Sequence, residues 1–256
     1  MRWWELLAAS VPGTTPRVQI TLREKHGVPS IVELVDIEMI PVLQLAPYDF
    51  GADGRPIPSR PYDEMPDEWY RYWLGSLADS GVTGVRPVYR GSWNVPTTEI
   101  TDLALLRSVL ELIFRKRRET ELGMEASSVW WPLYGGLALY CKSENVVIEP
   151  GCCADLSDEA RWHEVVDYKE AAWWPLPIGH PTQWVQYRAP RLIISSVQET
   201  TDPIARWAVC PERLRGALVP ALAELERFAE RMAGALPFNY EGEALLVGRK
   251  LAGLAE

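Results

Sequence analysis

The first part of the chain alternates polar and apolar side chains, which is typical of half-buried β-strands. Residues 17–23 (RVQITLR) carry apolar side chains at every second position, and residues 31–40 and 42–46 are rich in valine, isoleucine and leucine. Such patterns predict strands. A short helix is expected over residues 3–8, and His26 falls in a turn with no assigned role. We therefore expect the chain to open with a helix and a β-meander.

Helical periodicity is clear in the next part of the chain. A helix is expected to begin at Pro66, because proline and acidic side chains favour the first turn of a helix. Its apolar stripe is expected to face the core and comprises Trp69, Tyr72, Trp73 and Leu77. A second helix is predicted over residues 99–118, with Thr101 or Asp102 as its N-cap.

Residues 130–196 show the clearest succession of strands and turns. We expect one hairpin from residues 137–140 and 146–148, and a second from residues 183–188 and 192–196. This stretch is therefore the predicted sheet core of the protein.

Shorter elements complete the pattern. A helix capped by Ser157 and a short strand at Trp173-Trp174 are expected between the two hairpins. Before them, residues 82–89 are predicted as a strand and residues 92–98 as a loop. From residue 202 to residue 254 we expect helices, with Pro211 in a first turn and Pro220 kinking or splitting the helix.

These elements predict the α+β class, with a mixed, largely antiparallel sheet, helices packed on it and a C-terminal helical segment. Residues 47–66 contain five prolines and are expected to form a surface loop. We favour a single domain over residues 1–256, with the proline-rich loop as an excursion, the sheet core at 130–196 and the C-terminal helices at 202–254.

Composition narrows the classes of partner. The net charge is −9, which argues against nucleic acid and against an anionic membrane surface, since both attract basic proteins. No run approaches the ~18 apolar residues of a membrane span. The four cysteines match no disulfide framework, so a reduced, cytoplasmic protein is expected.

The adjacent cysteines Cys152 and Cys153 are candidates for chemistry. They lie just before a predicted helix, whose N-terminus can lower the pKa of a thiol, and either could pair with His163 or His180 in a catalytic site. We give more weight to the simpler interpretation that both are small buried side chains. Because the spacing lacks the usual CxxC or HxxxH pattern, we expect no metal site, and we expect no cofactor.

Acidic and aromatic side chains around the same segment favour a protein-binding surface. Acidic rims select basic partners, and tryptophans are enriched at binding hot spots. The candidate binding residues are Glu144, Glu149, Asp155, Asp158, Trp162, Trp173, Trp174 and Trp184.

The run VVIEPGCCADLSDEARW, followed by WW and GHP, resembles a group of uncharacterised bacterial proteins with a Gly-Cys-Cys-x-Asp-Leu element. That element is Gly151 to Leu156 here, and Trp162 matches a downstream tryptophan of the group. The stretch is also loosely similar to the SUKH superfamily, many members of which are immunity proteins that neutralise toxins. The resemblance covers about residues 131–196 and carries over no catalytic residue.

The leading hypothesis is therefore a non-enzymatic protein-binding module, with a toxin-neutralising immunity protein as its specific form and a basic toxin domain as the partner. The alternative is a thiol-dependent enzyme that uses Cys152 or Cys153 with a histidine. A stand-alone scaffold subunit is a third interpretation. No catalytic signature such as GxSxG, GxGxxG or HExxH is present in the sequence.

Overall fold

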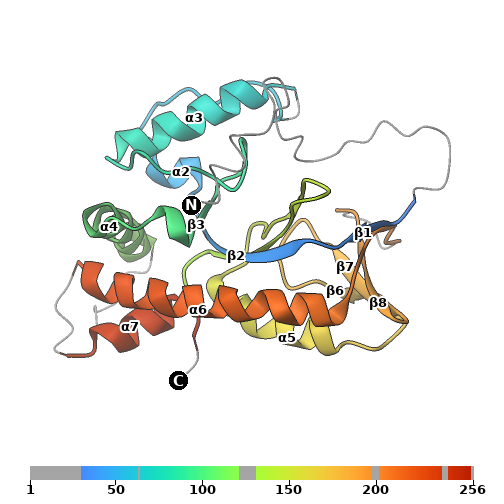
Figure 1. The fold of residues 1–256 in the computed structure, drawn as a ribbon. Coiled ribbons are helices and arrows are strands. Elements are labelled where there is room, and N and C mark those ends of the chain that lie inside the picture. Colours follow the sequence, from blue (N-terminus) through green and yellow to red (C-terminus); the bar gives the residue numbers. More distant parts are fainter. Residues whose placement is uncertain (1–29, 63, 121–130, 198–201, 238–241, 255–256) are drawn as a thin grey trace.

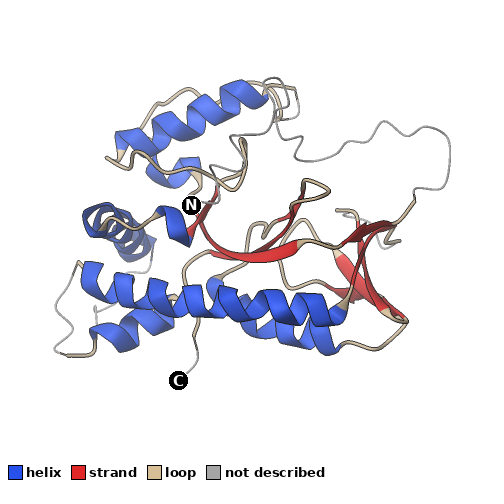
Figure 2. Cartoon of the chain, in the orientation of Figure 1, coloured by secondary structure: helices blue, strands red, loops and turns tan. Residues whose placement is uncertain are grey.

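The computed structural model describes residues 30–62, 64–120, 131–197, 202–237 and 242–254. Their strands form two sheets, and helices cover them (Figures 1 and 2). The expected α+β class with a C-terminal helix is confirmed. The expectations for residues 3–8, 17–23 and His26 lie outside the described residues.

The first sheet has the order β1-β9-β8-β7-β6. β1 pairs in parallel with β9, and the other neighbours are antiparallel. The strands are β1 (Val32–Leu34), β6 (Trp174–Pro175), β7 (Trp184–Arg188), β8 (Arg191–Ser195) and β9 (Ala205–Val209). The expected hairpin of residues 183–188 with 192–196 is thus β7 and β8, and the short strand expected at Trp173-Trp174 is β6.

The second sheet has the order β3-β2-β4-β5, and all its neighbours are antiparallel. Its strands are β2 (Ile37–Gln44), β3 (Asn94–Pro96), β4 (Gly135–Cys141) and β5 (Val146–Ile148). Only Val35 and Asp36 separate β1 from β2, so one short bend carries the chain from the first sheet to the second.

Helices surround the sheets. They are α2 (Pro47–Phe50), α3 (Pro66–Asp79), α4 (Leu103–Thr120), α5 (Glu159–Asp167), α6 (Pro211–Ala235) and α7 (Ala244–Leu251), with short 3-10 turns η1 (Thr97–Glu99) and η3 (Leu156–Asp158). In Figure 1, α6 runs along β2 and lies beside α4, α5 and α7, and these neighbours are in contact. The main apolar core includes residues of both sheets and of these helices.

The predicted helices at Pro66 and near residue 99 are confirmed as α3 and α4. Asp102 caps α4, because its Oδ1 accepts hydrogen bonds from the backbone N–H groups of Ala104 and Leu105 at 2.7 and 3.0 Å. The cap expected at Ser157 is wrong. Asp155 caps η3 instead, in a reciprocal capping box with Asp158.

Three local expectations about secondary structure are wrong. Residues 82–89 form no strand, since their buried valines recur at every third position rather than every second. Residues 92–98 were expected as loop but include β3, and the start of the predicted helical region is the strand β9.

Two prolines also act differently from the prediction. Pro47 opens the short helix α2 rather than a plain loop. Pro220 does not split α6, which continues to Ala235. Pro220 and Gly216 are both exposed, so water can bond the Gly216 carbonyl that lost its helical N–H donor.

Candidate functional site

Two loops meet where β5 ends. One leads from Glu149 to Asp155, and the other precedes β7 at residues 176–181. The backbone N–H of Gly151 donates to the carbonyl of Ile178 at 2.7 Å. Cys152 and His180 then exchange two backbone hydrogen bonds, N–H to carbonyl in each direction, both of 2.9 Å. These bonds hold the two loops together as a short two-residue ladder.

Glycine is required on both sides of this contact. A β-carbon on Gly151 would overlap the carbonyl oxygen of His180, and one on Gly179 would overlap that of Cys152. Gly179 also has φ of +73°, a conformation that residues with a β-carbon rarely adopt. The close approach of the two loops therefore depends on glycine at positions 151 and 179.

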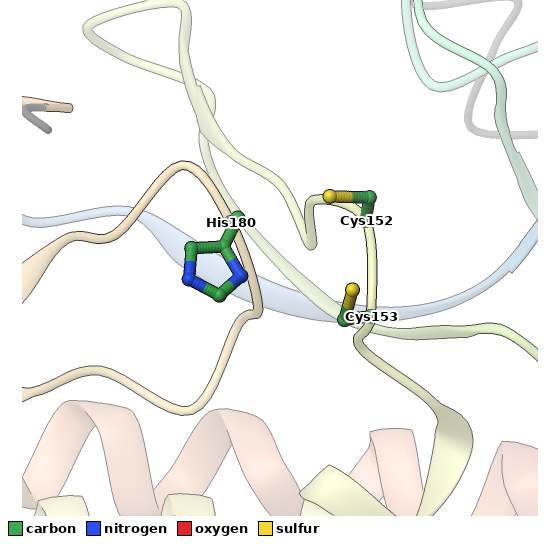
Figure 3. A group of neighbouring side chains, drawn as sticks. All are labelled: Cys152, Cys153 and His180. Atoms are coloured by element: carbon green, nitrogen blue, oxygen red, sulfur yellow. The ribbon is translucent and has the colours of Figure 1, made fainter.

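The loops bring two thiols and an imidazole together. The donor atoms of Cys152, Cys153 and His180 all lie within 4.8 Å of one another, and all three residues are exposed. Figure 3 shows both sulfurs and the ring facing the space between the two loops. We call these three residues the thiol-imidazole cluster.

The expectation that Cys152 and Cys153 are buried is therefore wrong. The buried positions of this segment belong to their neighbours Ala154 and Leu156, which are 1% and 0% exposed. Cys153 has φ of +67°, so the chain turns sharply there before it enters the core. A left-handed conformation at a residue other than glycine costs about 1–3 kcal/mol, and such residues concentrate at functional sites.

A lowered thiol pKa is not found at Cys153. A hydrogen bond with Cys152, the charge of Cys152 and then partial burial raise the pKa of the Cys153 thiol. The N-terminus of the short helix that follows is capped by the Asp155 side chain. The structure therefore offers no sign of a thiolate poised for attack at Cys153.

His163 is not part of the thiol-imidazole cluster. It lies exposed on α5, where burial raises the pKa of Glu159 and the electrostatic effect of the neighbouring His163 opposes that rise. Of the four residues considered for a catalytic pair, the structure thus groups Cys152, Cys153 and His180 and separates His163.

The predicted acidic and tryptophan-rich surface is not assembled as expected. Trp162 is 0% exposed in the core, so its assignment as a binding residue is wrong. Asp155 and Asp158 are occupied by the capping box. Glu144 is exposed in the turn between β4 and β5.

The other three predicted tryptophans are half-buried. Trp173 lies just before β6, and Trp184 begins β7. Trp174 stacks against Tyr168 with ring centroids 5.4 Å apart. These residues therefore retain some exposed surface.

Glu149 points inward rather than toward a partner. Its carboxylate accepts hydrogen bonds from the hydroxyls of Tyr89 and Ser92 and, at 2.9 Å, from the side-chain amide of Asn94. Burial raises the pKa of Glu149, and these three hydrogen bonds oppose the rise. Asn94 also donates to the carbonyl of Pro150 at 2.9 Å, so the network fixes the start of the loop that carries the cysteines.

A different group of aromatic rings reaches the surface. The ring of Tyr48 meets Trp93 edge to face at 5.5 Å, Trp93 lies 6.4 Å from Trp69, and Trp69 lies 5.7 Å from Tyr72. Tyr48 is 59% exposed, and the other three are half-buried. We call these four residues the aromatic surface.

The backbone and side chains around the aromatic surface hold it in place. The indole N–H of Trp69 donates to the carbonyl of Arg60 at 2.7 Å, and the carbonyl of Trp93 accepts from the N–H of Leu45 at 2.9 Å. The pKa of Tyr48 is raised by burial, then by the charge of Asp49, and then by that of Cys152.

Sequence patterns missed the aromatic surface for a simple reason. Trp69 and Tyr72 were assigned to the core together with Trp73 and Leu77, but only the latter two are buried. The spacing of Trp69 and Tyr72, three residues apart, places them together on one face, beside the core stripe. The sequence feature that could have indicated an exposed aromatic ring was Trp93, which lies between the polar residues Ser92 and Asn94.

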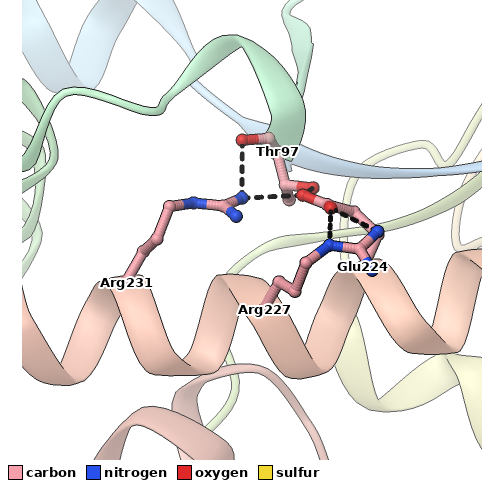
Figure 4. A network of polar contacts seen from close by, with 4 residues as sticks. All are labelled: Thr97, Glu224, Arg227 and Arg231. Atoms are coloured by element: carbon pink, nitrogen blue, oxygen red, sulfur yellow. Dashed lines mark hydrogen bonds and ion pairs between the residues drawn. The ribbon is translucent and has the colours of Figure 1, made fainter.

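A second polar cluster lies where α6 meets η1. The Glu224 carboxylate accepts from Arg231 at 2.7 Å, from Arg227 at 3.0 Å and from the Thr97 hydroxyl at 3.1 Å (Figure 4). Arg231 also donates to the Thr97 carbonyl at 3.0 Å. The network neutralises a buried carboxylate and ties the two elements together, so its role is structural.

A groove of about 630 Å³ opens beside that network, between β2 and α6. Its lining is mixed, with apolar side chains such as Ile37 and Ala217 and charged ones such as Arg213 and Glu38. The lining includes no cysteine or histidine and lies apart from the thiol-imidazole cluster.

Comparison with family models, with curated proteins and with solved structures finds no match for this chain. Within the described ranges, no helix is both long and apolar enough to cross a membrane.

Proposed function

We propose that this protein acts by binding another protein through the aromatic surface, and that its partner is a basic domain. The observation that carries the proposal is the connected group of four partly exposed rings formed by Tyr48, Trp69, Tyr72 and Trp93. Tryptophan and tyrosine dominate binding hot spots because they bury a large area with few rotatable bonds.

Rigidity favours the same proposal. The rings pack against one another, and the indole hydrogen bond of Trp69 and the backbone hydrogen bond of Trp93 help to fix this arrangement before any partner arrives. A pre-organised surface loses less side-chain entropy on binding. The charge of −9 supports a basic partner, because opposite potentials speed encounter and reject acidic proteins.

The resemblance of residues 131–196 to immunity proteins is the reason to name a toxin as the partner. In this proposal the protein works in the cytoplasm and neutralises a basic toxin domain by covering part of its surface. The gene for such a partner is expected to lie next to the gene for this protein.

Calorimetric titration with the purified product of the adjacent gene tests the proposal. We expect tight one-to-one binding that Trp93→Ala weakens by ~30-fold, which corresponds to about 2 kcal/mol at a hot spot. Leu245→Ala is the matched control, because Leu245 is a 50% exposed side chain on α7, away from the aromatic surface. Absence of binding, or equal effects of both substitutions, would contradict the proposal.

One observation favours a thiol-dependent enzyme as the second candidate, namely the proximity of Cys152 to His180. The raised pKa of Cys153 counts against Cys153 as the nucleophile of such an enzyme, since nucleophilic cysteines have lowered values. The rate of alkylation of Cys152 by iodoacetamide between pH 5 and pH 9 separates the two. A thiolate already formed near pH 6 would support an enzyme, and a rate that rises only above about pH 8 would exclude it.

A further inference from the structure

We propose that Cys152, Cys153 and His180 form a binding site for one thiophilic divalent cation, with Zn²⁺ as the ion that fits best. The proposal does not depend on the protein-binding role, because it rests on the thiol-imidazole cluster alone. Two sulfur donors and one ring nitrogen lie within 4.8 Å of one another, from two loops that are separate in the sequence.

The separations suit a tetrahedral ion. Zn²⁺ binds sulfur at about 2.3 Å and imidazole nitrogen at about 2.0 Å, so ligand atoms around it lie roughly 3.7 Å apart. The observed upper limit of 4.8 Å exceeds this by about 1 Å. In the proposed site, rotation of the three side chains brings the donor atoms to this spacing.

The backbone already holds the donors in register. The paired hydrogen bonds of 2.9 Å fix Cys152 opposite His180, and the absence of a β-carbon at Gly151 and Gly179 allows the loops to lie this close. The left-handed turn at Cys153 places its sulfur beside that of its neighbour, as Figure 3 shows. In this proposal, the left-handed conformation of Cys153 allows the side chains of the adjacent residues Cys152 and Cys153 to bind the same ion.

The chemical type of the ligand atoms determines which metal ion the site would prefer. Thiolate and imidazole ligands favour Zn²⁺ and similar soft or borderline ions, whereas Mg²⁺ and Ca²⁺ need oxygen ligands. On binding, both thiols lose their protons to the solvent, and two thiolates balance the two positive charges of the ion while His180 stays neutral. The donors are exposed, so water can fill the fourth position of the tetrahedron.

The spacing of the three ligands along the sequence did not predict a metal site. Structural zinc motifs place pairs of ligands a few residues apart, and here two ligands are adjacent while the third comes from another loop. The ladder between Cys152 and His180 is what makes them neighbours.

Cobalt titration tests the proposal directly. The full chain is stripped with a chelator, kept reduced without oxygen, and titrated with Co²⁺. We expect a near-ultraviolet thiolate-to-cobalt charge-transfer band, visible bands typical of tetrahedral coordination, saturation at one ion per chain, and loss of all bands when Zn²⁺ is added.

Substitutions locate the ion. Cys152→Ser, Cys153→Ser and His180→Asn should each weaken Co²⁺ binding by more than about 100-fold, since loss of even a supporting residue near a metal costs about 10–100-fold. Cys210→Ser and His163→Asn are matched controls. They alter a partly exposed cysteine and an exposed histidine outside the cluster and should leave the titration unchanged.

Circular dichroism of every variant separates loss of the site from loss of the fold. The proposal is overturned if the reduced wild type gives no thiolate-to-cobalt band. It is overturned equally if folded Cys152→Ser and Cys153→Ser variants keep the band, or if the controls lose it. Mass spectrometry of the same samples confirms that all four cysteines are reduced, so an absent band cannot arise from a disulfide.

Discussion

Cys152 and His180 exchange two backbone hydrogen bonds of 2.9 Å, which join two loops at the end of β5 and before β7. The contact leaves both side chains exposed and directs them to a common space (Figure 3). A backbone ladder, rather than side-chain packing, therefore creates the thiol-imidazole cluster, and a change in the backbone should disturb the cluster most.

Gly151→Ala is predicted to destabilise the protein by about 2 kcal/mol, because the added methyl group would overlap the His180 carbonyl. Urea unfolding measures the change. Gly216→Ala is the matched control on α6, where nothing lies within 4 Å of the new carbon. There alanine should stabilise the helix by about 0.5–1 kcal/mol. Equal effects at the two glycines would contradict the account of the loop contact.

Glu224→Ala is predicted to cost about 3–5 kcal/mol of unfolding free energy. The substitution removes a buried carboxylate and leaves Arg231, whose side chain is 21% exposed, without its ionic partner. Arg227→Ala should cost less than about 1 kcal/mol, since that side chain is 59% exposed. Thermal or urea unfolding of both variants checks the order, and a larger loss for Arg227→Ala would contradict it.

Glu149→Gln is predicted to change the pH dependence of stability. Burial raises the pKa of Glu149 in the folded protein, so the folded state holds its proton more tightly than the unfolded chain does. The wild type should therefore lose stability relative to the Gln variant as the pH rises above about 4.3, the ordinary value for glutamate. The difference should become constant above the folded pKa. Urea unfolding from pH 3 to pH 8 measures it, and a difference that moves the opposite way would show that the hydrogen bonds outweigh burial.

Substitution of Trp162 is predicted to destabilise the protein much more than substitution of Trp93. Trp162→Ala removes a 0% exposed ring from the core and should cost about 3–5 kcal/mol of stability. Trp93→Ala removes a half-buried ring of the aromatic surface and should cost about 1 kcal/mol. Calorimetric unfolding distinguishes them, and a comparable loss for Trp93 would mean that this ring serves the fold rather than a partner.

Periodicity predicted the elements whose pattern is set by local burial. The stripe of α4, the β4–β5 hairpin and the β7–β8 hairpin each carry a regular apolar spacing, and each is present. The strand β9 was missed because it directly precedes the strongly helical pattern of α6. β3 was missed because its short run, Asn94–Pro96, looks like a loop until β2 pairs with it.

The candidate site was harder to predict because it depends on contacts between distant segments. Cys152 and Cys153 were identified from the sequence, but average burial statistics placed them inside the protein. The structure places Ala154 and Leu156 in the core and leaves both cysteines exposed. The choice between His163 and His180 likewise needed the backbone pairing with Cys152.

Hydrogen–deuterium exchange, with and without the product of the adjacent gene, tests the central claim most directly. A bound partner slows exchange of the amides that it covers or stabilises. The account predicts added protection in α2, in the first half of α3 and around Trp93, the segments that carry the aromatic surface. Protection confined to α7 or to the groove between β2 and α6, with no change in those segments, would contradict it.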